Sequence, residues 1–341
     1  MANSLSLDED TQVDRISNLP SSLICHILSF LNTKEAIATS ILSSRWKPLW
    51  ILVPTLDLQD DCRQEPISFT HIVYRVLALH IAPLLRNFSL AWYSPCNSFH
   101  LDAWIHTALA RNVEHLRLEI YLNGQDGTEF YNGRRFELPR SFYFCRTVVV
   151  LELTGGIVLD PPPSFQFPSL KIMSLCEILY RPHYSFSMLL CGCPVLEDLS
   201  VTRDGTDGLI NFNVSLPTLK RLSIEFYTYE RDLPDYKLEI YAPALEYFGF
   251  RGDLRNVVFL KKLANLVEAH VEVRAVEFLQ EDWVREHKIY YGDRVFKLVR
   301  ALNHAKFFSL YPGDKEVRSL YFLFLLLFYF IFSNIVRNIV R

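Results

Sequence analysis

The segments PVLEDLSV (residues 194–201), PTLKRLSI (217–224) and PALEYFGF (243–250) share one pattern, and that pattern decides the fold. Apolar residues stand at the third, sixth and eighth positions of each segment, and a proline stands at the first. Alternation such as Leu222-Ser223-Ile224 is typical of a strand with one buried face. Because proline cannot donate a hydrogen bond to a sheet, we expect it where each short strand begins.

The same pattern recurs along most of the chain. Its first apolar positions lie 22, 26, 23, 26 and 21 residues apart, at Val148, Leu170, Leu196, Leu219, Leu245 and Leu266. Looser matches begin at Val53, Leu85, Val113 and Ala305. A period of about 20–29 residues with this pattern resembles leucine-rich repeats, here in an irregular form that lacks most of the consensus asparagines.

Each repeat of this kind adds one strand to a continuous sheet and cannot bury its apolar face alone. The sequence therefore predicts an α/β fold in which residues 53–318 form a solenoid with a parallel sheet on its concave face, most clearly over residues 148–275. Residues 66–84 are expected to form a helix that connects the first strand to the second.

The segment before the repeats, residues 14–52, is predicted to be a small module of three short helices. Pro20 suits the first position of a helix, and Asn32 suits the cap of a second one. A third short helix is expected to carry Trp46 and Leu49. So few residues cannot bury this much apolar surface among themselves, so part of it needs a partner.

The order of these residues resembles the F-box, in the form that is common in plants, through Ile16, Leu19-Pro20, Leu23, Ile27-Leu28, Leu31, Ser40-Ile41-Leu42-Ser43 and Arg45-Trp46-Lys47-Pro48-Leu49-Trp50. The resemblance implies that the module binds the Skp-family adaptor of a cullin–RING ubiquitin ligase. The residues implied in adaptor binding are Ile16, Leu19, Pro20, Leu23, Ile27, Leu28, Leu31, Ile41, Leu42 and Trp46.

The residue between each pair of buried positions is expected to face the concave side of the sheet. These positions give the candidate target-binding residues Arg117, Glu152, Ser174, Ser200, Ser223 and His270, with Gly249 and Ser309 in equivalent places. Four serines and a glycine predict a shallow surface, to which Arg117, Glu152 and His270 add charge. An ordinary solvated sheet face is the alternative interpretation of each position.

Composition excludes several classes of function. Half of the 341 residues are hydrophobic, and 35 basic residues stand against 38 acidic ones, so a nucleic-acid partner is not expected. None of the common hydrolase, metalloprotease or nucleotide-binding motifs occurs, and we expect no catalysis, cofactor or metal. The seven cysteines are scattered and the N-terminus is acidic, which favours a reducing compartment, the cytoplasm or the nucleus.

The C-terminal residues 319–341 depart from the repeat pattern. Residues 320–332 are an uninterrupted apolar run whose helix would span about 20 Å, short of the ~30 Å hydrocarbon core of a membrane. Membrane association through this tail is one interpretation, and a last element capping the solenoid is another. Plant F-box proteins with such repeats often continue into a further domain called FBD, so a truncated or alternatively spliced end is the third.

The leading hypothesis is a substrate-recognition subunit of an SCF-type (Skp–cullin–F-box) ubiquitin ligase, in which the module binds the adaptor and the repeats hold a protein target. The alternatives are a repeat interaction protein that is not part of a ligase, and a protein anchored in a membrane by residues 319–341. The target protein, its recruiting signal and any small-molecule co-ligand are not encoded in a recognisable motif.

Overall fold

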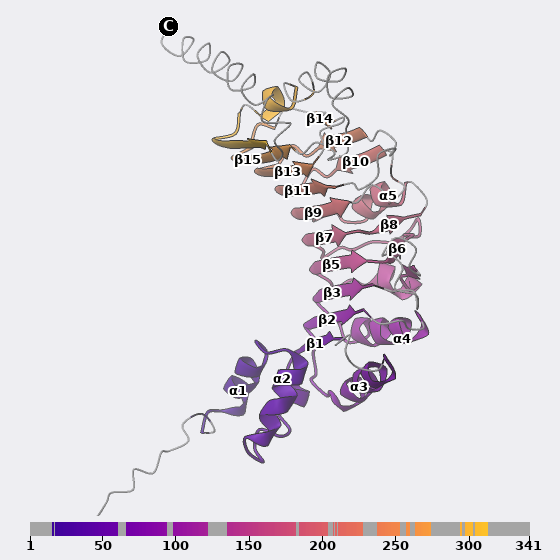
Figure 1. Cartoon of the computed structure of the whole chain (residues 1–341), viewed down its shortest axis with the longest axis vertical. Coiled ribbons are helices and arrows are strands. Elements are labelled where there is room, and N and C mark those ends of the chain that lie inside the picture. The colour runs from indigo at the N-terminus through magenta and orange to yellow at the C-terminus, as the bar shows by residue number, and fades with distance from the viewer. Residues whose placement is uncertain are drawn as a thin grey trace, which may run out of the picture.

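The structure is a computed structural model. It describes residues 16, 18–60, 66–93, 98–121, 135–181, 184–203, 207, 209, 211–227, 237–252, 257–259, 263–273, 294, 297–302 and 304–312. Within these residues a small helical module leads into a curved stack of parallel strands, and the two together form a crescent (Figure 1). The predicted combination of N-terminal helices and a parallel-strand repeat region is confirmed.

One parallel sheet of ten strands runs through the whole array. Every predicted repeat, including the four looser ones, supplies one strand, and successive repeats lie side by side in register. In sheet order these are β1 (Thr55–Gln59), β2 (Asn87–Trp92), β3 (His115–Ile120), β5 (Val150–Gly155), β7 (Ile172–Cys176), β9 (Asp198–Arg203), β11 (Arg221–Phe226), β13 (Tyr247–Gly252), β15 (Glu268–Val273) and β16 (Phe307–Pro312).

The prolines were expected at the first residue of each strand, and this prediction is wrong. They lie in a turn four residues before the strand begins. In the repeat of β9, the Leu196 N–H donates to the Cys193 carbonyl and Pro194 occupies the second position of that turn. Proline is favoured there because its fixed φ suits a β-turn and its missing N–H is not needed. The same bond recurs where Leu219 and Leu245 follow their prolines.

The core lies behind the sheet, where the buried position of each repeat meets the next. Leu151, Met173, Leu199, Leu222 and Phe248 are partners across five adjacent strands, and none of them is exposed. Complete burial of one such side chain contributes about 1.5–3 kcal/mol relative to an exposed one. Since each side chain packs on those of its neighbours, the stack of repeats forms one continuous core.

The convex side is covered by different elements along the crescent (Figure 1). The helices there are α3 (Pro66–Leu79), α4 (Ser98–Leu109), η3 (Arg140–Phe144) and α5 (Ser185–Cys191). Two small parallel sheets complete the cover, β4 (Phe136–Glu137), β6 (Ile157–Leu159) and β8 (Leu179–Tyr180), then β10 (Asn211–Ser215), β12 (Lys237–Tyr241) and β14 (Val257–Phe259). The helix predicted over residues 66–84 exists but ends at Leu79, and α4 and both small sheets were not predicted.

The helical module contains α1 (Ser21–Leu28), α2 (Thr33–Ala38), η1 (Thr39–Ile41) and η2 (Trp50–Leu52). The third short helix was predicted to carry Trp46 and Leu49, but residues 44–49 form turns and a 3₁₀ helix follows only at Trp50–Leu52. Pro48 explains the difference, because its ring disfavours the α conformation of Lys47 and removes a backbone donor. Trp46 and Leu49 still reach the core of the module, next to Leu28.

The module is joined to the array by hydrogen bonds as well as by the chain. The Thr33 Oγ1 atom accepts from the backbone N–H of Asp57 at 2.8 Å, which ties α2 to β1. The His80 Nε2 atom lies 2.7 Å from the Val53 carbonyl, and the side chain is 4% exposed. Two successive N–H groups after His80 donate to the Ile51 carbonyl, each at 3.0 Å. These bonds fix the module against the first repeat.

The predicted hydrophobic tail, residues 319–341, lies outside the described residues. In the part of the chain that the structure describes, no helix combines the length and the apolar character needed to cross a membrane. The last described strand, β16, extends the sheet beyond β15.

Candidate functional site

The helical module presents apolar side chains to solvent. Six of the ten residues implied in adaptor binding are exposed, namely Ile16, Pro20, Leu23, Ile27, Ile41 and Leu42, and Leu19 and Leu31 are half-buried. The most exposed of them is Ile41, at 87%. Phe30, just after the end of α1, is also strongly exposed. It was not among the residues implied in adaptor binding, although it follows Leu23 and Ile27 at helical spacing.

Two residues of the implied set lie inside the module instead. Leu28 is fully buried and Trp46 is 5% exposed, and both belong to the core cluster that also contains Ile24 and Leu49. A side chain enclosed by its own domain has no surface to offer a partner. We therefore reassign Leu28 and Trp46 as residues that support the exposed ones from within.

Local hydrogen bonds hold the exposed apolar residues in place. Asn32 caps α2 in a reciprocal arrangement: its Oδ1 accepts from the Glu35 N–H at 2.8 Å, and the Glu35 carboxylate accepts from the Asn32 N–H at 3.3 Å. Arg45 donates to the Leu19 carbonyl, which ties the first turn of the module to its last segment. Ile41 is the last residue of η1, the 3₁₀ helix that directly follows α2.

The concave face of the array is made of three rows of side chains that run across the sheet. The predicted positions form the middle row, in which Arg117, Glu152, Ser174, Ser200 and Ser223 are direct partners on successive strands. Gly249, His270 and Ser309 continue this row to β16. The two flanking rows were not predicted, although strand alternation places residues two positions away on the same face.

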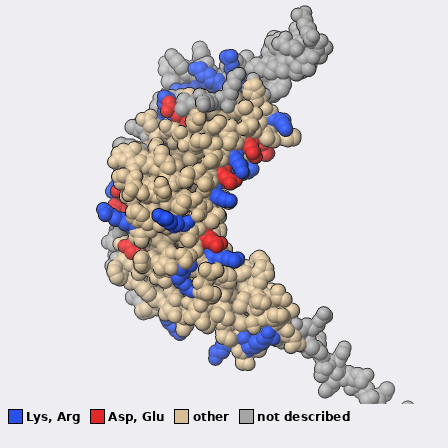
Figure 2. Space-filling model, turned by 180° about the vertical axis from the view of Figure 1, so that it is seen from behind, with Lys and Arg blue, Asp and Glu red and all other residues tan. Residues whose placement is uncertain are grey.

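Acidic groups outnumber basic ones over the three rows. Figure 2 shows acidic and basic side chains next to one another along the inner side of the crescent. The rows contain seven carboxylates and three guanidinium groups, a formal excess of four negative charges, from Asp57, Glu119, Glu152, Asp198, Glu225, Glu268 and Glu272 against Arg117, Arg221 and Arg251. The face as a whole favours basic ligands.

Charged residues gather at two places on this face. Near its N-terminal end, the Arg117 guanidinium lies 3.4 Å from Glu119 and 3.8 Å from Glu152, and the His115 ring is 3.0 Å from Glu152. The Tyr93 hydroxyl donates to Glu119 at 2.6 Å. The structure thus brings the predicted residues Arg117 and Glu152 together in one cluster.

The middle of the face is smoother. Ser174, Ser200 and Ser223 are partners on β7, β9 and β11, and Ile172 exposes an apolar side chain beside them. In the flanking row of the same strands, Arg221 lies 3.3 Å from Asp198 and stacks on the Tyr247 ring, 4.3 Å from its centroid. The short serine side chains are consistent in size along this stretch, and the predicted role of these positions in target binding stays a prediction.

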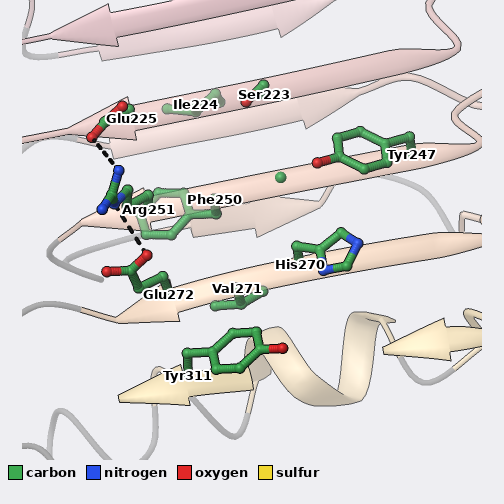
Figure 3. Close-up of a pocket in the computed structure, with 11 residues that line it drawn as sticks. Ser223, Ile224, Glu225, Tyr247, Phe250, Arg251, His270, Val271, Glu272 and Tyr311 are labelled. Atoms are coloured by element: carbon green, nitrogen blue, oxygen red, sulfur yellow. Dashed lines mark ion pairs between the residues drawn. The ribbon is translucent and has the colours of Figure 1, made fainter. Parts of the chain in front are cut away.

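The second charged place is near the C-terminal end of the face (Figure 3). Arg251 of β13 lies between Glu225 of β11, at 3.3 Å, and Glu272 of β15, at 3.1 Å. The His270 ring bonds Glu268 at 2.5 Å and Ser309 on its other nitrogen. Sequence-predicted His270 therefore lies in this cluster, whereas Arg251 and both its partners were not predicted.

Two thiols, the half-buried Cys176 and the buried Cys193, are poorly suited to covalent chemistry. Burial, together with the nearby Glu177 carboxylate, raises the pKa of Cys176 to about 11. Burial raises the pKa of Cys193 to about 12, and its Sγ donates to the Leu189 carbonyl at 3.1 Å. Among the described residues, no group of three or more histidine, cysteine, aspartate or glutamate side chains is arranged to hold a metal ion.

Two known sequence families match this chain, one over the helical module and one over the array. The sequence profile of the F-box domain matches residues 16–55, and that of the leucine-rich repeats of FBD-associated F-box protein At5g56370 matches residues 101–258. F-box protein At4g09920 of Arabidopsis thaliana is 34% identical over 267 residues, which are 76% of this chain and 81% of that relative. The chain belongs to the plant F-box proteins with leucine-rich repeats.

Other relatives of this F-box protein are longer. F-box/FBD/LRR-repeat protein At4g26340 of Arabidopsis thaliana is 34% identical over 263 residues, which are 76% of this chain and 60% of that relative. Putative FBD-associated F-box protein At5g56820 of the same plant is 36% identical over 279 residues, 80% of this chain and 60% of the relative. The chain thus spans about 60% of the length of these two relatives.

The matched ranges coincide with the elements that carry the two surfaces. The F-box match spans α1 to η2, and the repeat match spans β3 to β13, which includes both charged places as far as Arg251. The two family matches therefore fall on the helical module and on the central part of the array.

Proposed function

We propose that this protein is the substrate-recognition subunit of an SCF-type ubiquitin ligase. Its F-box binds a Skp-family adaptor and, through it, a cullin–RING ligase, while the concave face of the array binds a protein target. The protein performs no bond chemistry itself. It holds the target near the ubiquitin-conjugating enzyme, and proximity of this kind replaces part of the entropic barrier of a bimolecular reaction.

The observation that carries the proposal is the exposed pair Ile41 and Leu42. Their side chains are 87% and 63% exposed, on a module that has its own small core. Exposed apolar residues grouped on so short a segment are costly in water and are typical of a surface that a partner covers. Ile16, Leu23 and Ile27, which the F-box resemblance also implies, are exposed as well.

The array supports the second half of the proposal. Its concave face displays charged clusters at Arg117 and at Arg251, separated by a stretch of serines that is flanked by the Arg221–Asp198 pair. A rigid, curved surface with separated polar contacts suits an extended or convex protein partner. The predicted target-binding residues Arg117, Glu152 and His270 lie in these clusters.

The test is capture of the full chain by a plant Skp-family adaptor. An Ile41→Ser, Leu42→Ser variant should lose capture, since both changes remove apolar surface without touching the core of the module. A Phe144→Ser variant is the matched control, because Phe144 is also exposed but lies on η3 of the array. It should be captured as well as the unmodified chain.

Two results would contradict the proposal. Failure of the folded, unmodified chain to bind the adaptor would leave a repeat interaction protein outside any ligase. Equal capture of the double variant and the unmodified chain would show that Ile41 and Leu42 are not the docking surface. Circular dichroism of each protein establishes that it is folded before the capture is interpreted.

A further inference from the structure

The concave face is hollowed between β11 and β16, at the second charged place (Figure 3). The cavity has a volume of about 340 Å³, which lies at the lower end of the ~300–1,000 Å³ range of ligand pockets. Its lining includes Glu225, Tyr247, Gly249, Arg251, Glu272 and Tyr311. We call this cavity the Gly249 hollow.

The hollow exists because the middle row carries a glycine at this point. A Cβ atom added to Gly249 would lie 3.2 Å from the Tyr247 hydroxyl and 3.3 Å from the Ser223 Oγ. The Tyr247 side chain, labelled in Figure 3, therefore reaches over position 249. Any larger residue at 249 would fill the floor of the hollow.

Aromatic rings form two sides of the hollow. The Tyr247 ring lies across β13, with the His270 ring 5.7 Å away between centroids. Tyr311 of β16 contributes a second phenol that is 60% exposed. One face of Tyr247 is covered by the Arg221 guanidinium, 4.3 Å from the ring centroid. The remaining ring surface offers flat apolar area to the hydrocarbon stem of a ligand.

The charges of the hollow favour a cation. Arg251 faces two carboxylates, Glu225 and Glu272, so the three groups carry one net negative charge. Glu268, hydrogen-bonded to His270, adds a third carboxylate at the edge. An anion would have to displace carboxylates from Arg251, whereas a cation can approach carboxylates whose side chains are about one-third exposed.

We propose that the Gly249 hollow is a recognition pocket for a basic side chain, lysine or arginine, of the target protein. The ligand's cation lies beside Glu225 and Glu272, and its stem lies along Tyr247 and Tyr311. The inference rests on the proposed function for the source of the side chain. It agrees with the excess of four negative charges over the whole concave face.

The experiment measures binding of small probes to the full chain by ligand-observed NMR. The probes are the Nα-acetyl methylamides of lysine, arginine and norleucine, the last having a lysine-like stem without the charge. We expect one of the two basic probes to bind at least about tenfold more tightly than norleucine, because a charge-assisted hydrogen bond is lost with the ammonium group. Raising the salt concentration should weaken that binding.

Two variants and a control locate the site. Glu225→Gln removes the net negative charge at constant size and should weaken the basic probe about tenfold or more. Gly249→Val fills the floor and should abolish binding of every probe to the hollow. Glu114→Gln is the matched control, because Glu114 is an exposed carboxylate just before β3, and this variant should bind the basic probe like the unmodified chain.

Equal binding of norleucine and the basic probes, no binding of either basic probe, or an unchanged affinity of Glu225→Gln would each overturn the inference. Adaptor capture is measured on the same samples. Loss of adaptor binding with retained lysine or arginine binding would refute the ligase proposal and leave the pocket. The reverse result would refute the pocket and leave the ligase proposal.

Discussion

Truncation of Ile41 to alanine isolates the contribution of one exposed side chain to adaptor binding. The change removes three carbon atoms, each worth about 0.8 kcal/mol when it is transferred from water to an apolar contact. Because Ile41 is 87% exposed in the free chain, nearly all of this surface is available for burial. If the adaptor covers it, Ile41→Ala should weaken binding by about 2 kcal/mol, which is roughly 30-fold in Kd.

The assay is isothermal titration of the purified full chain with the Skp-family adaptor, with thermal unfolding of the free chain measured in parallel. Unfolding should change little, since exposed substitutions that leave the core untouched usually alter stability by less than about 0.5 kcal/mol. A Kd within about twofold of the unmodified chain would refute the reasoning. A large drop in the stability of the free chain would refute it too, because Ile41 would then be part of the fold.

Four further predictions concern buried residues. Leu28→Ala opens a cavity in the module and should lower its unfolding free energy by about 2–5 kcal/mol in urea denaturation; a change below about 1 kcal/mol would contradict the burial. Asp207→Ala leaves the Arg203 guanidinium buried without its carboxylate and should cost about 3–5 kcal/mol in the same assay; a loss below about 1 kcal/mol would contradict this. Burial lowers the pKa of His80, so the unfolded chain binds a proton there at a higher pH than the folded chain does. The free energy of unfolding should therefore fall as the pH drops below about 6.5. The fall should be smaller in His80→Gln, and an equal fall in both proteins would contradict the assignment to His80. Burial raises the pKa of Cys193 to about 12, so alkylation at pH 8 followed by mass spectrometry should find that thiol unmodified until the chain is unfolded; rapid modification in the native state would contradict this.

The strands of the array were predictable because two regularities coincide in each repeat. The apolar positions two residues apart specify a half-buried strand, and the repeat spacing specifies its parallel neighbour. Even the weak match at Ala305 supplied a strand, since Phe308 pairs with Ala269 in register with the strands before it. Stacking makes each strand depend on its neighbours, so a weak repeat adopts the fold of the strong ones.

The turns and the module were predicted less well because local chemistry decides them. Pro194 was expected to open β9, yet its fixed φ serves a turn that positions Leu196 for burial. The helical spacing of Trp46 and Leu49 suggested a helix that Pro48 interrupts. In both cases the apolar pattern was correct about burial and wrong about backbone conformation, because a turn can bury the same side chains as a helix.

The Gly249 hollow could not have been predicted, because it depends on contacts between strands that are distant in the sequence. Glu225, Arg251 and Glu272 meet only when β11, β13 and β15 stand in register. The sequence pointed to Gly249 as part of a shallow row, but not to Tyr247 leaning over it. The core residues of a repeat protein can be predicted from the spacing of its apolar residues. The clusters on its surface can be identified only when the register of neighbouring strands is known.

The connection between module and array decides what the two surfaces can do together. The bonds of Thr33 to β1 and of His80 to Val53 make the first repeat continuous with the F-box. From β1 the sheet continues without a break to β13, seven strand spacings of about 4.8 Å, so Arg251 lies roughly 34 Å along the sheet from the F-box. In the proposed ligase, a target held at the Gly249 hollow would lie at this distance along the sheet from the adaptor. The array would then contribute to ubiquitin transfer by proximity, because it holds a target lysine near the conjugating enzyme.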